Sequence, residues 1–236
     1  MSRKAREDRV TPDLPNHFIS RGNNRRRLFS YPSDYKTFIW LLAQATNKTG
    51  CHLNAVSLMA NHTHKVMTPP SVESSSRCVA SFAQRYAQIR NLRRGGTGKL
   101  FEERFFSEPI NDDAHLMLAT MYIDANPIRA GIVKNAIDYP WSTYGLHVGE
   151  PDRSAIPAAI WTPSRWYREL GRTDAARAQT YRELFEAYLA RGAEKEYDES
   201  DWRAFARREH PYTRRLTRPN GSYAREPILR SRLERT

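Results

Sequence analysis

The sequence has little cysteine, no long apolar run and no internal repeat, and each absence excludes a class of protein. Cys51 and Cys78 are too few and too isolated to form a disulfide framework or a CxxC metal site. No stretch approaches the roughly 18 consecutive apolar residues that a membrane-spanning helix needs. The basic start MSRKAREDRV lacks the apolar segment of a secretion signal. We therefore expect a reduced, cytoplasmic protein that does not bind membranes.

Acidic residues are also in deficit. Asp and Glu total 26 against 38 Lys and Arg, which gives the chain a net charge of +12. A basic excess favours a polyanionic partner, because phosphates that are neutralised by the protein release condensed counterions. A basic soluble protein with no such partner would have the same composition, so the motifs have to decide between the two.

The order of the expected elements predicts an α+β fold. Alternating and helical patterns indicate the following succession of strands and helices: strand 16–20, helix 34–48, strands 53–59 and 62–68, helix 72–90, strand 104–110, and a helix that Asp112 or Asp113 caps and Pro127 ends after Asn126. This order is that of a ferredoxin-like split βαβ layout, with an antiparallel sheet and a final helix packed against it.

The residue composition and patterning of the sequence change after residue 148. We assign residues 1–148 to a catalytic domain, residues 149–213 to a helical extension and residues 214–236 to a basic, flexible tail. Prolines 151, 157 and 163 mark a loop-like start, and residues 174–192 have the apolar stripe of an amphipathic helix. The tail contains seven arginines and two glutamates.

Two motifs contain residues suited to chemistry. His62 and His64 are two apart on an expected strand, so they project from one face and can hold a divalent cation with open coordination positions. Tyr122 and Asn126 are four apart on an expected helix and are neighbours on its surface. The alternatives are a pair of half-exposed polar histidines and a tyrosine that packs at the edge of an apolar face.

Several motifs together closely resemble those of one family. They are HFISRGNNRRRLF, LMANHTHKVMTP, GKLFEERFF and YIDANPIRAGIVKNAIDYPWSTY. In this order they resemble the REP-associated tyrosine transposases, bacterial relatives of the single-strand insertion-sequence transposases of the HUH group (His, bulky hydrophobic, His). The similarity covers residues 17–144 and continues more weakly to about residue 189.

The resemblance implies a fold, an activity and a set of roles. The fold is ferredoxin-like. His62 and His64 match the metal-binding pair, Tyr122 the catalytic nucleophile and Asn126 the position that completes the metal shell. The implied reaction nicks and joins single-stranded DNA through a 5′-phosphotyrosine, with Mg²⁺ or Mn²⁺ as cofactor. The implied substrate is a palindromic, REP-like hairpin in the bacterial nucleoid. We expect a monomer, with a dimer as the alternative.

Basic clusters are expected to bind the DNA. The candidates are Arg21, Arg25, Arg26, Arg27, Arg90, Arg93, Arg94, Lys99, Arg104 and Arg129. A solvated charged surface is the alternative for any one of them. Tyr86 and Phe106 are candidates for stacking on bases, with a place in the core as the competing interpretation. The remaining histidines receive no role; they are His17, His52, His115, His147 and His210.

Two residues depart from the family pattern. Thr63 stands between the histidines, where the family prefers a bulky apolar residue, and Lys65 occupies the next position on the same face. A lysine there has to reach solvent or find a partner. The departures support an alternative function, a domesticated protein that binds a DNA hairpin in a sequence-specific way with little or no cleavage. A third interpretation, a non-catalytic metalloprotein or nucleic-acid chaperone, leaves Tyr122 and Asn126 unexplained.

Overall fold

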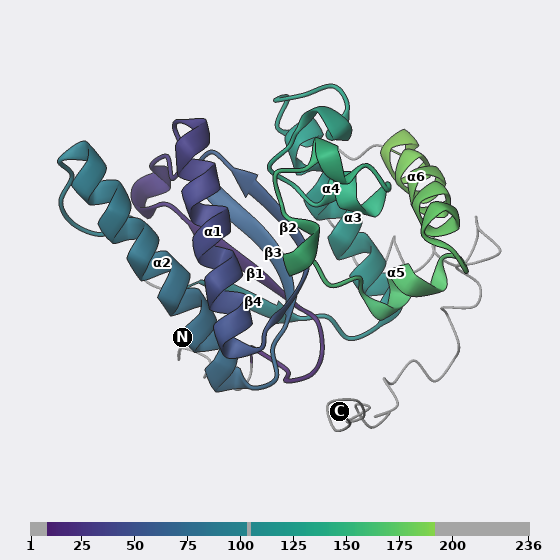
Figure 1. Cartoon of the computed structure of the whole chain (residues 1–236), viewed down its shortest axis with the longest axis horizontal. Helices are drawn as coiled ribbons and strands as arrows, with labels where there is room; N and C mark the ends of the chain where they lie inside the picture. Colours follow the sequence, from purple (N-terminus) through teal and green to yellow (C-terminus); the bar gives the residue numbers. More distant parts are fainter. Residues whose placement is uncertain (1–8, 103–104, 192–236) are drawn as a thin grey trace, which may run out of the picture.

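The computed structural model describes residues 9–102 and 105–191. Four strands and six α-helices follow one another, with short 3₁₀ turns between some of them (Figure 1). Their bounds are β1 Asn16–Arg21, α1 Pro32–Thr49, β2 His52–Met59, β3 His62–Thr68, α2 Val72–Arg94, β4 Phe106–Pro109, α3 Asp113–Arg129, α4 Tyr144–His147, α5 Arg165–Glu169 and α6 Asp174–Ala190. Among the described residues, none of the helices combines the length and the apolar character that crossing a membrane requires.

The sheet confirms the predicted fold class. Its strand order is β2-β3-β1-β4, and the three neighbouring pairs are all antiparallel. Together with α1 between β1 and β2 and α2 between β3 and β4, this is the ferredoxin-like arrangement. The element bounds differ from the expected ones by a few residues, mainly because α2 is longer and β4 is shorter than predicted.

The predicted end of the last catalytic-domain helix was wrong. Pro127 lies inside α3, which continues to Arg129. A proline lacks an N–H and disturbs the turn before it, but the residues after it can keep helical angles. The backbone N–H of Ala130 donates to the carbonyl of Asn126 at 2.9 Å, so the ladder resumes after the proline. As a result, Arg129 belongs to the same helix as Tyr122.

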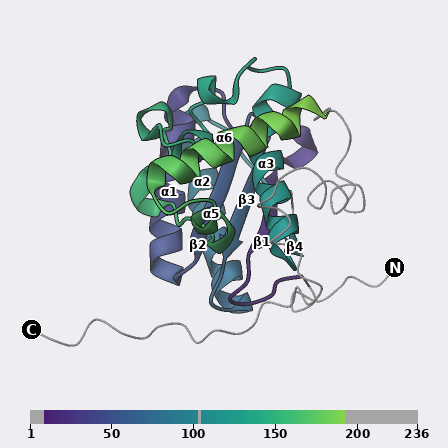
Figure 2. The same cartoon turned by 90° about the vertical axis from the view of Figure 1, so that its right-hand side faces the viewer.

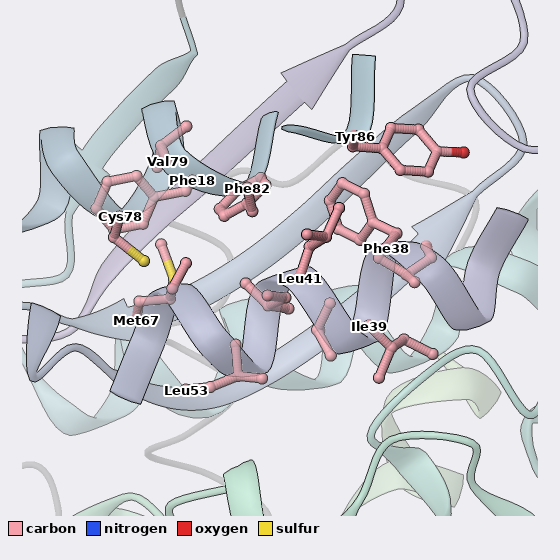
Figure 3. Close-up of a cluster of buried hydrophobic side chains, with 14 of the residues drawn as sticks. Phe18, Phe38, Ile39, Leu41, Leu53, Met67, Cys78, Val79, Phe82 and Tyr86 are labelled. Carbon is pink, nitrogen blue, oxygen red and sulfur yellow. The ribbon is translucent and has the colours of Figure 1, made fainter. Parts of the chain in front are cut away.

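Helices α1 and α2 cover one face of the sheet (Figures 1 and 3). Phe18, Leu53 and Met67 project from three strands into this layer, where they meet Phe38 of α1 and Phe82 of α2 in one buried cluster. The rings of Phe38 and Phe82 lie edge to face with centroids 5.2 Å apart. Burial of large apolar side chains on this face fixes the register of the strands, since a slip by one residue would turn them outward.

The opposite face is covered by α3 and by the helices that follow it. In Figure 2, which looks onto this side, α6 lies nearest the viewer. Ala55 and Val66 of the sheet belong to a second buried cluster with residues of α3, α5 and α6, among them Trp166 and Phe185. The described part of the predicted extension, residues 149–191, therefore packs against the helix that carries Tyr122. Residues 192–213 and the predicted tail 214–236 lie outside the described residues.

A buried carboxylate fixes the back of α3. Asp124 is fully buried and accepts hydrogen bonds from His147 Nδ1 at 2.7 Å, Tyr181 Oη at 2.6 Å and Thr143 Oγ1 at 3.3 Å. These donors come from α4, from α6 and from the residue before α4. Burial and the neighbouring Asp124 raise the pKa of Tyr181 well above its usual range. Because Asp124 and Tyr122 point to roughly opposite sides of the helix, the network holds the orientation of the tyrosine.

Lys65, the most unexpected residue of β3, lies on the α1–α2 side of the sheet and does not reach solvent. It is fully buried, and its amine donates to Thr63 Oγ1 at 2.5 Å and to Ser20 Oγ at 3.3 Å. It also lies 5.5 Å from the centroid of the Phe82 ring. Thr63 and Lys65, the two residues that depart from the family pattern, are therefore hydrogen-bonded to each other within the core. Both project away from the face of the sheet that carries the histidines.

This burial predicts a pH-dependent stability. Loss of hydration lowers the pKa of Lys65 from 10.5 to about 7. Between these values the unfolded chain binds more protons than the folded one, so stability rises with pH. Lys65→Met should raise the free energy of unfolding at pH 7 by about 2–4 kcal/mol, and this gain should shrink as the pH approaches 10. Urea unfolding of both proteins at pH 7, 8, 9 and 10 measures it; a gain that does not change with pH would contradict a buried, neutralised lysine.

Candidate functional site

The pairing of β1 with β3 places two histidines on the α3 side of the sheet. His62 lies opposite Arg21, and His64 lies opposite Ile19. The two imidazole rings are arranged edge to face, with centroids 4.9 Å apart. His64 is buried, whereas His62 is half-buried at the end of the strand. As expected from the alternation of a strand, the rings project together and are close enough to ligate one ion.

Helix α3 brings Tyr122 to this pair. The ring of Tyr122 is half-buried and lies 5.6 Å from the ring of His64, centroid to centroid. Asn126 follows one turn later on the same stripe of the helix. Its side chain is buried, and the amide nitrogen has no hydrogen-bond partner among the described residues. A half-turn of the amide would present its oxygen at the same place.

Arg129 completes the stripe two turns after Tyr122. Its guanidinium carbon lies 4.5 Å from the centroid of the Tyr122 ring, a cation–π contact. Its Nη1 is buried and has no hydrogen-bond partner within the described part of the chain. The charge of Arg129 also acts on Tyr188 of α6. Burial raises the pKa of Tyr188 to about 12, and Arg129 opposes this rise. A permanent cation with a free donor thus lies beside the phenol.

The environment keeps the imidazoles neutral. Loss of hydration lowers the pKa of His64 well below 6.5, and the surrounding histidines, Lys65 and Arg21 lower it further. Loss of hydration, Arg21 and Lys65 also lower the pKa of His62. A neutral imidazole has a nitrogen lone pair available for a metal, whereas an imidazolium has none.

The residues present fit a divalent cation that has open coordination positions. The donor set is two neutral imidazoles and the amide of Asn126, whose nitrogen lacks a hydrogen-bond partner among the described residues. Within residues 9–102 and 105–191, no group of three or more His, Cys, Asp and Glu side chains is arranged as a metal site. The set therefore differs from the four-ligand shell of a structural zinc site and leaves room for water or phosphate oxygens.

The two predicted basic clusters form one surface at the His62 end of the sheet. Residues 22–27 make a tight loop, in which the N–H of Gly22 donates to the carbonyl of Asn61 and the N–H of Asn23 to the carbonyl of Leu100. Gly22 is required there, because a Cβ would lie 2.1 Å from the carbonyl oxygen of Arg26. Arg26 in turn donates to the carbonyl of Lys99 at 3.2 Å. This loop and the end of β1 before it expose four arginines, namely Arg21, Arg25, Arg26 and Arg27.

Other predicted DNA-binding arginines have protein partners. Arg90 donates to the carbonyl of Leu28 at 3.0 Å and to that of Arg27 at 3.2 Å, which anchors the basic loop to α2. Arg94 forms an ion pair with Asp34 at 2.7 Å, and Arg93 donates to Thr37 Oγ1 at 3.1 Å. These contacts indicate structural roles, and DNA binding by Arg90, Arg93 and Arg94 stays a prediction. Arg104 lies outside the described residues.

The two candidate stacking aromatics differ in their positions. Tyr86 is buried and its hydroxyl donates to the carbonyl of Leu28 at 2.7 Å, so it belongs to the core. Phe106 is 47% exposed on β4 and is paired with Ile19, which places it on the same face of the sheet as His64. Phe106 therefore remains available to a base at the free edge of the sheet.

Two residues that were not predicted from the sequence touch the histidines. Asn61 Oδ1 lies 2.7 Å from His62 Nδ1, and His17 Nε2 lies 3.0 Å from His64 Nδ1. Asn61 stands next to the motif, so its contact was accessible to inspection of the turn. His17 is 47 residues away from His64, and the contact depends on the register between β1 and β3. No local pattern in the sequence reports that register.

Comparisons with known proteins identify a family match and similar folds. Residues 11–126 match the family described as "Transposase IS200 like". The chain is similar to the structure of a REP-associated tyrosine transposase bound to a REP hairpin, with a TM-score of 0.54 and 19% identity over 70% of this chain and 93% of that one. A transposase-like protein from Deinococcus radiodurans R1 has a TM-score of 0.37 and 16% identity, over 50% of this chain and 92% of that one. None of the curated proteins matches the chain significantly.

Proposed function

Because the chain belongs to the IS200-like transposase family through residues 11–126, we propose that it nicks and rejoins single-stranded DNA with Tyr122 as the nucleophile. The observation that carries the proposal is the meeting of three side chains from two elements, β3 and α3. The Tyr122 ring lies 5.6 Å from that of His64, which lies 4.9 Å from that of His62. A tyrosine that only packed in the core would not account for the two neutral imidazoles beside it. It would also not account for the amide nitrogen of Asn126, which has no hydrogen-bond partner among the described residues.

In the proposed step, the Tyr122 oxygen attacks the phosphorus of a phosphodiester. An O–P bond to tyrosine forms, the bond between phosphorus and the 3′ oxygen breaks, and the product is a 5′-phosphotyrosine with a free 3′-hydroxyl. The phenol proton leaves to solvent, and the leaving oxygen takes up a proton from solvent. Joining is the reverse attack by a 3′-hydroxyl. Because the covalent link preserves the phosphoester, joining needs no ATP.

His62, His64 and Asn126 would hold a divalent cation, for which we propose Mg²⁺ or Mn²⁺. When bound, such an ion polarises a phosphoryl oxygen and stabilises a phenolate. Hydroxyl groups of tyrosine have an ordinary pKa of about 10 and need cationic neighbours to react at neutral pH. Arg129 supplies one such neighbour from the protein itself, with its guanidinium carbon 4.5 Å from the centroid of the ring, and we propose that this guanidinium binds a phosphate oxygen.

The proposed substrate is single-stranded DNA beside a palindromic hairpin. The similar structure is that of a transposase bound to a REP hairpin. Here the exposed arginines 21, 25, 26 and 27 lie next to His62, where they can bind the backbone of a strand that leads to Tyr122. Phe106 offers an aromatic face on the other side of His64.

One experiment separates this enzyme from the alternative, a protein that binds the hairpin without cleaving it. Full-length protein is incubated with Mn²⁺ and an end-labelled foldback oligonucleotide with single-stranded flanks. We expect a labelled, SDS-resistant adduct and a shortened strand. Tight binding in a mobility-shift assay without adduct or cleavage would instead favour the binding protein. The structure weakens the main support for that alternative, because Lys65 and Thr63 are paired on the far side of the sheet.

The basic surface makes a separate prediction. Replacing Arg25 and Arg26 together with Gln should weaken binding of single-stranded DNA and lower the slope of log affinity against log salt by about 1.4, since each contact with a single strand contributes roughly 0.7. The control changes Arg168 and Arg172 to Gln. These exposed arginines, in and just after α5, give the same loss of charge. Helix α5 follows Thr162, which is hydrogen-bonded to Asn54 near the start of β2, at the opposite end of the β2–β3 pair from His62. An equal change of slope in both variants would mean that net charge, rather than this surface, determines binding.

A further inference from the structure

We propose that His17 is a positioning residue that keeps the proton of His64 on Nδ1 and thereby directs the Nε2 lone pair of His64 to the metal. The inference rests on the proposed function, because it concerns how the metal-binding ring is oriented. It assigns a role to a histidine of β1 whose ring lies edge to face with that of Tyr122, at a centroid distance of 6.4 Å, and which acts through His64.

The strands place His17 beside His64. His17 lies opposite Val66 on β1, while His64 lies opposite Ile19, so the two histidines are diagonal neighbours on one face. Their rings are stacked, with centroids 5.2 Å apart and an angle of 27° between the planes. His17 Nε2 lies 3.0 Å from His64 Nδ1, which is the length of an N–H···N hydrogen bond.

The protonation of the pair leaves one arrangement that allows metal binding. The contact joins two ring nitrogens, Nε2 of His17 and Nδ1 of His64, with one proton between them. Each neutral ring carries one proton, so one ring donates and the other accepts. If His64 donates from Nδ1, its Nε2 has a lone pair for the metal. If His17 donates, His64 carries its proton on Nε2 and cannot ligate there.

His62, the other proposed metal-binding histidine, also has a hydrogen-bond partner at Nδ1. His62 Nδ1 lies 2.7 Å from Asn61 Oδ1, and an amide oxygen can only accept, so His62 donates from Nδ1 and presents Nε2. The Asn61 amide is itself oriented by a contact of 3.5 Å from its nitrogen to the carbonyl of Arg25. His62 and His64 thus both have their Nδ1 engaged by a neighbour, which is how metal-binding histidines are commonly oriented.

A direct role of His17 as a third ligand fits the contacts less well. His17 Nε2 faces the Nδ1 of His64, which is the nitrogen that the hydrogen bond engages. Within residues 9–102 and 105–191, no three histidine, cysteine or carboxylate side chains converge as a metal site. The two roles predict different results for a variant that keeps an acceptor but is a poor ligand.

Mn²⁺ affinity of the full chain, measured by calorimetry without DNA, tests the proposal. His17→Leu removes the acceptor and fills similar space; we expect the affinity to fall by about 10–100-fold. His17→Gln places an amide oxygen close to the position of Nε2, and we expect an affinity within about threefold of wild type. His52→Leu, an exposed histidine of β2, is the control and should change nothing.

Each other outcome overturns the inference in a distinguishable way. Unchanged affinity in His17→Leu would show that His17 does not position His64, while the proposed function stands. Equal losses in the Leu and Gln variants would show direct ligation. Absence of Mn²⁺ binding by the wild type would overturn the metal part of the proposed function as well. Should His17→Leu fail to fold, the histidine ¹⁵N NMR spectrum of the wild type decides, since the proposal requires the proton of His64 on Nδ1.

Discussion

Tyr122→Phe should produce no covalent DNA adduct and should reduce strand cleavage by at least about 10³-fold, because the substitution removes the attacking oxygen. The phenyl ring keeps its position next to His64 and beneath Arg129, so the fold and the charge of the site are preserved. DNA affinity should therefore change by less than about threefold. Gel analysis of the adduct and a mobility-shift titration measure the two quantities on the same preparation.

Tyr144→Phe is the matched control for this variant. Tyr144 is also half-buried, but it packs on Phe185 of α6 at a centroid distance of 4.7 Å, on the far side of α3 from the histidines. Its loss should leave adduct formation unchanged. If Tyr122→Phe still formed the adduct, another residue would be the nucleophile and the assignment of Tyr122 would be wrong.

The double variant His62→Ala, His64→Ala should lose both Mn²⁺ binding and cleavage. The two imidazoles are the strongest donors of the set, and the single amide of Asn126 cannot hold the ion alone. We expect calorimetry to detect no Mn²⁺ binding, and cleavage to fall by about 10³-fold or more. DNA affinity should stay within a few fold, because the exposed arginines of residues 21–27 are unchanged.

A measurement of the folded fraction makes this second prediction specific. If the histidines only packed against α3, the double variant would lose stability, and cleavage per folded molecule would be retained. Thermal unfolding of the same samples gives the folded fraction. Full cleavage by the folded double variant would contradict the role of the histidines as metal ligands and leave Tyr122 to act without them.

The fold was predictable because its signals are local. The alternation of residues 53–59 and 62–68 and the apolar stripes of the helices fixed the order of elements, and the observed strand order β2-β3-β1-β4 follows from that layout. The end of α3 was missed, because a proline disturbs the turn before it without preventing the following residues from staying helical. The error hid the fact that Arg129 is on the stripe of Tyr122.

The site was predictable only in part. His62 and His64 are two apart, and Tyr122 and Asn126 are four apart, so local geometry groups each pair. That the pairs meet depends on how α3 packs on β3, which spacing alone does not report. The contact of His17 with His64 and the burial of Lys65 both depend on strand register and on what the facing helices leave open. The sequence motifs contain no information on these long-range contacts.

The most direct test of the central claim is to locate the DNA on the protein. The adduct is digested with nuclease and trypsin, and the peptides are read by tandem mass spectrometry. Cleavage after Arg104 and Arg129 releases peptide 105–129, in which Tyr122 is the sole tyrosine. We predict that this peptide carries a 5′-linked nucleotide on Tyr122. A nucleotide on any other residue, or a linked peptide from another part of the chain, would contradict the proposed mechanism.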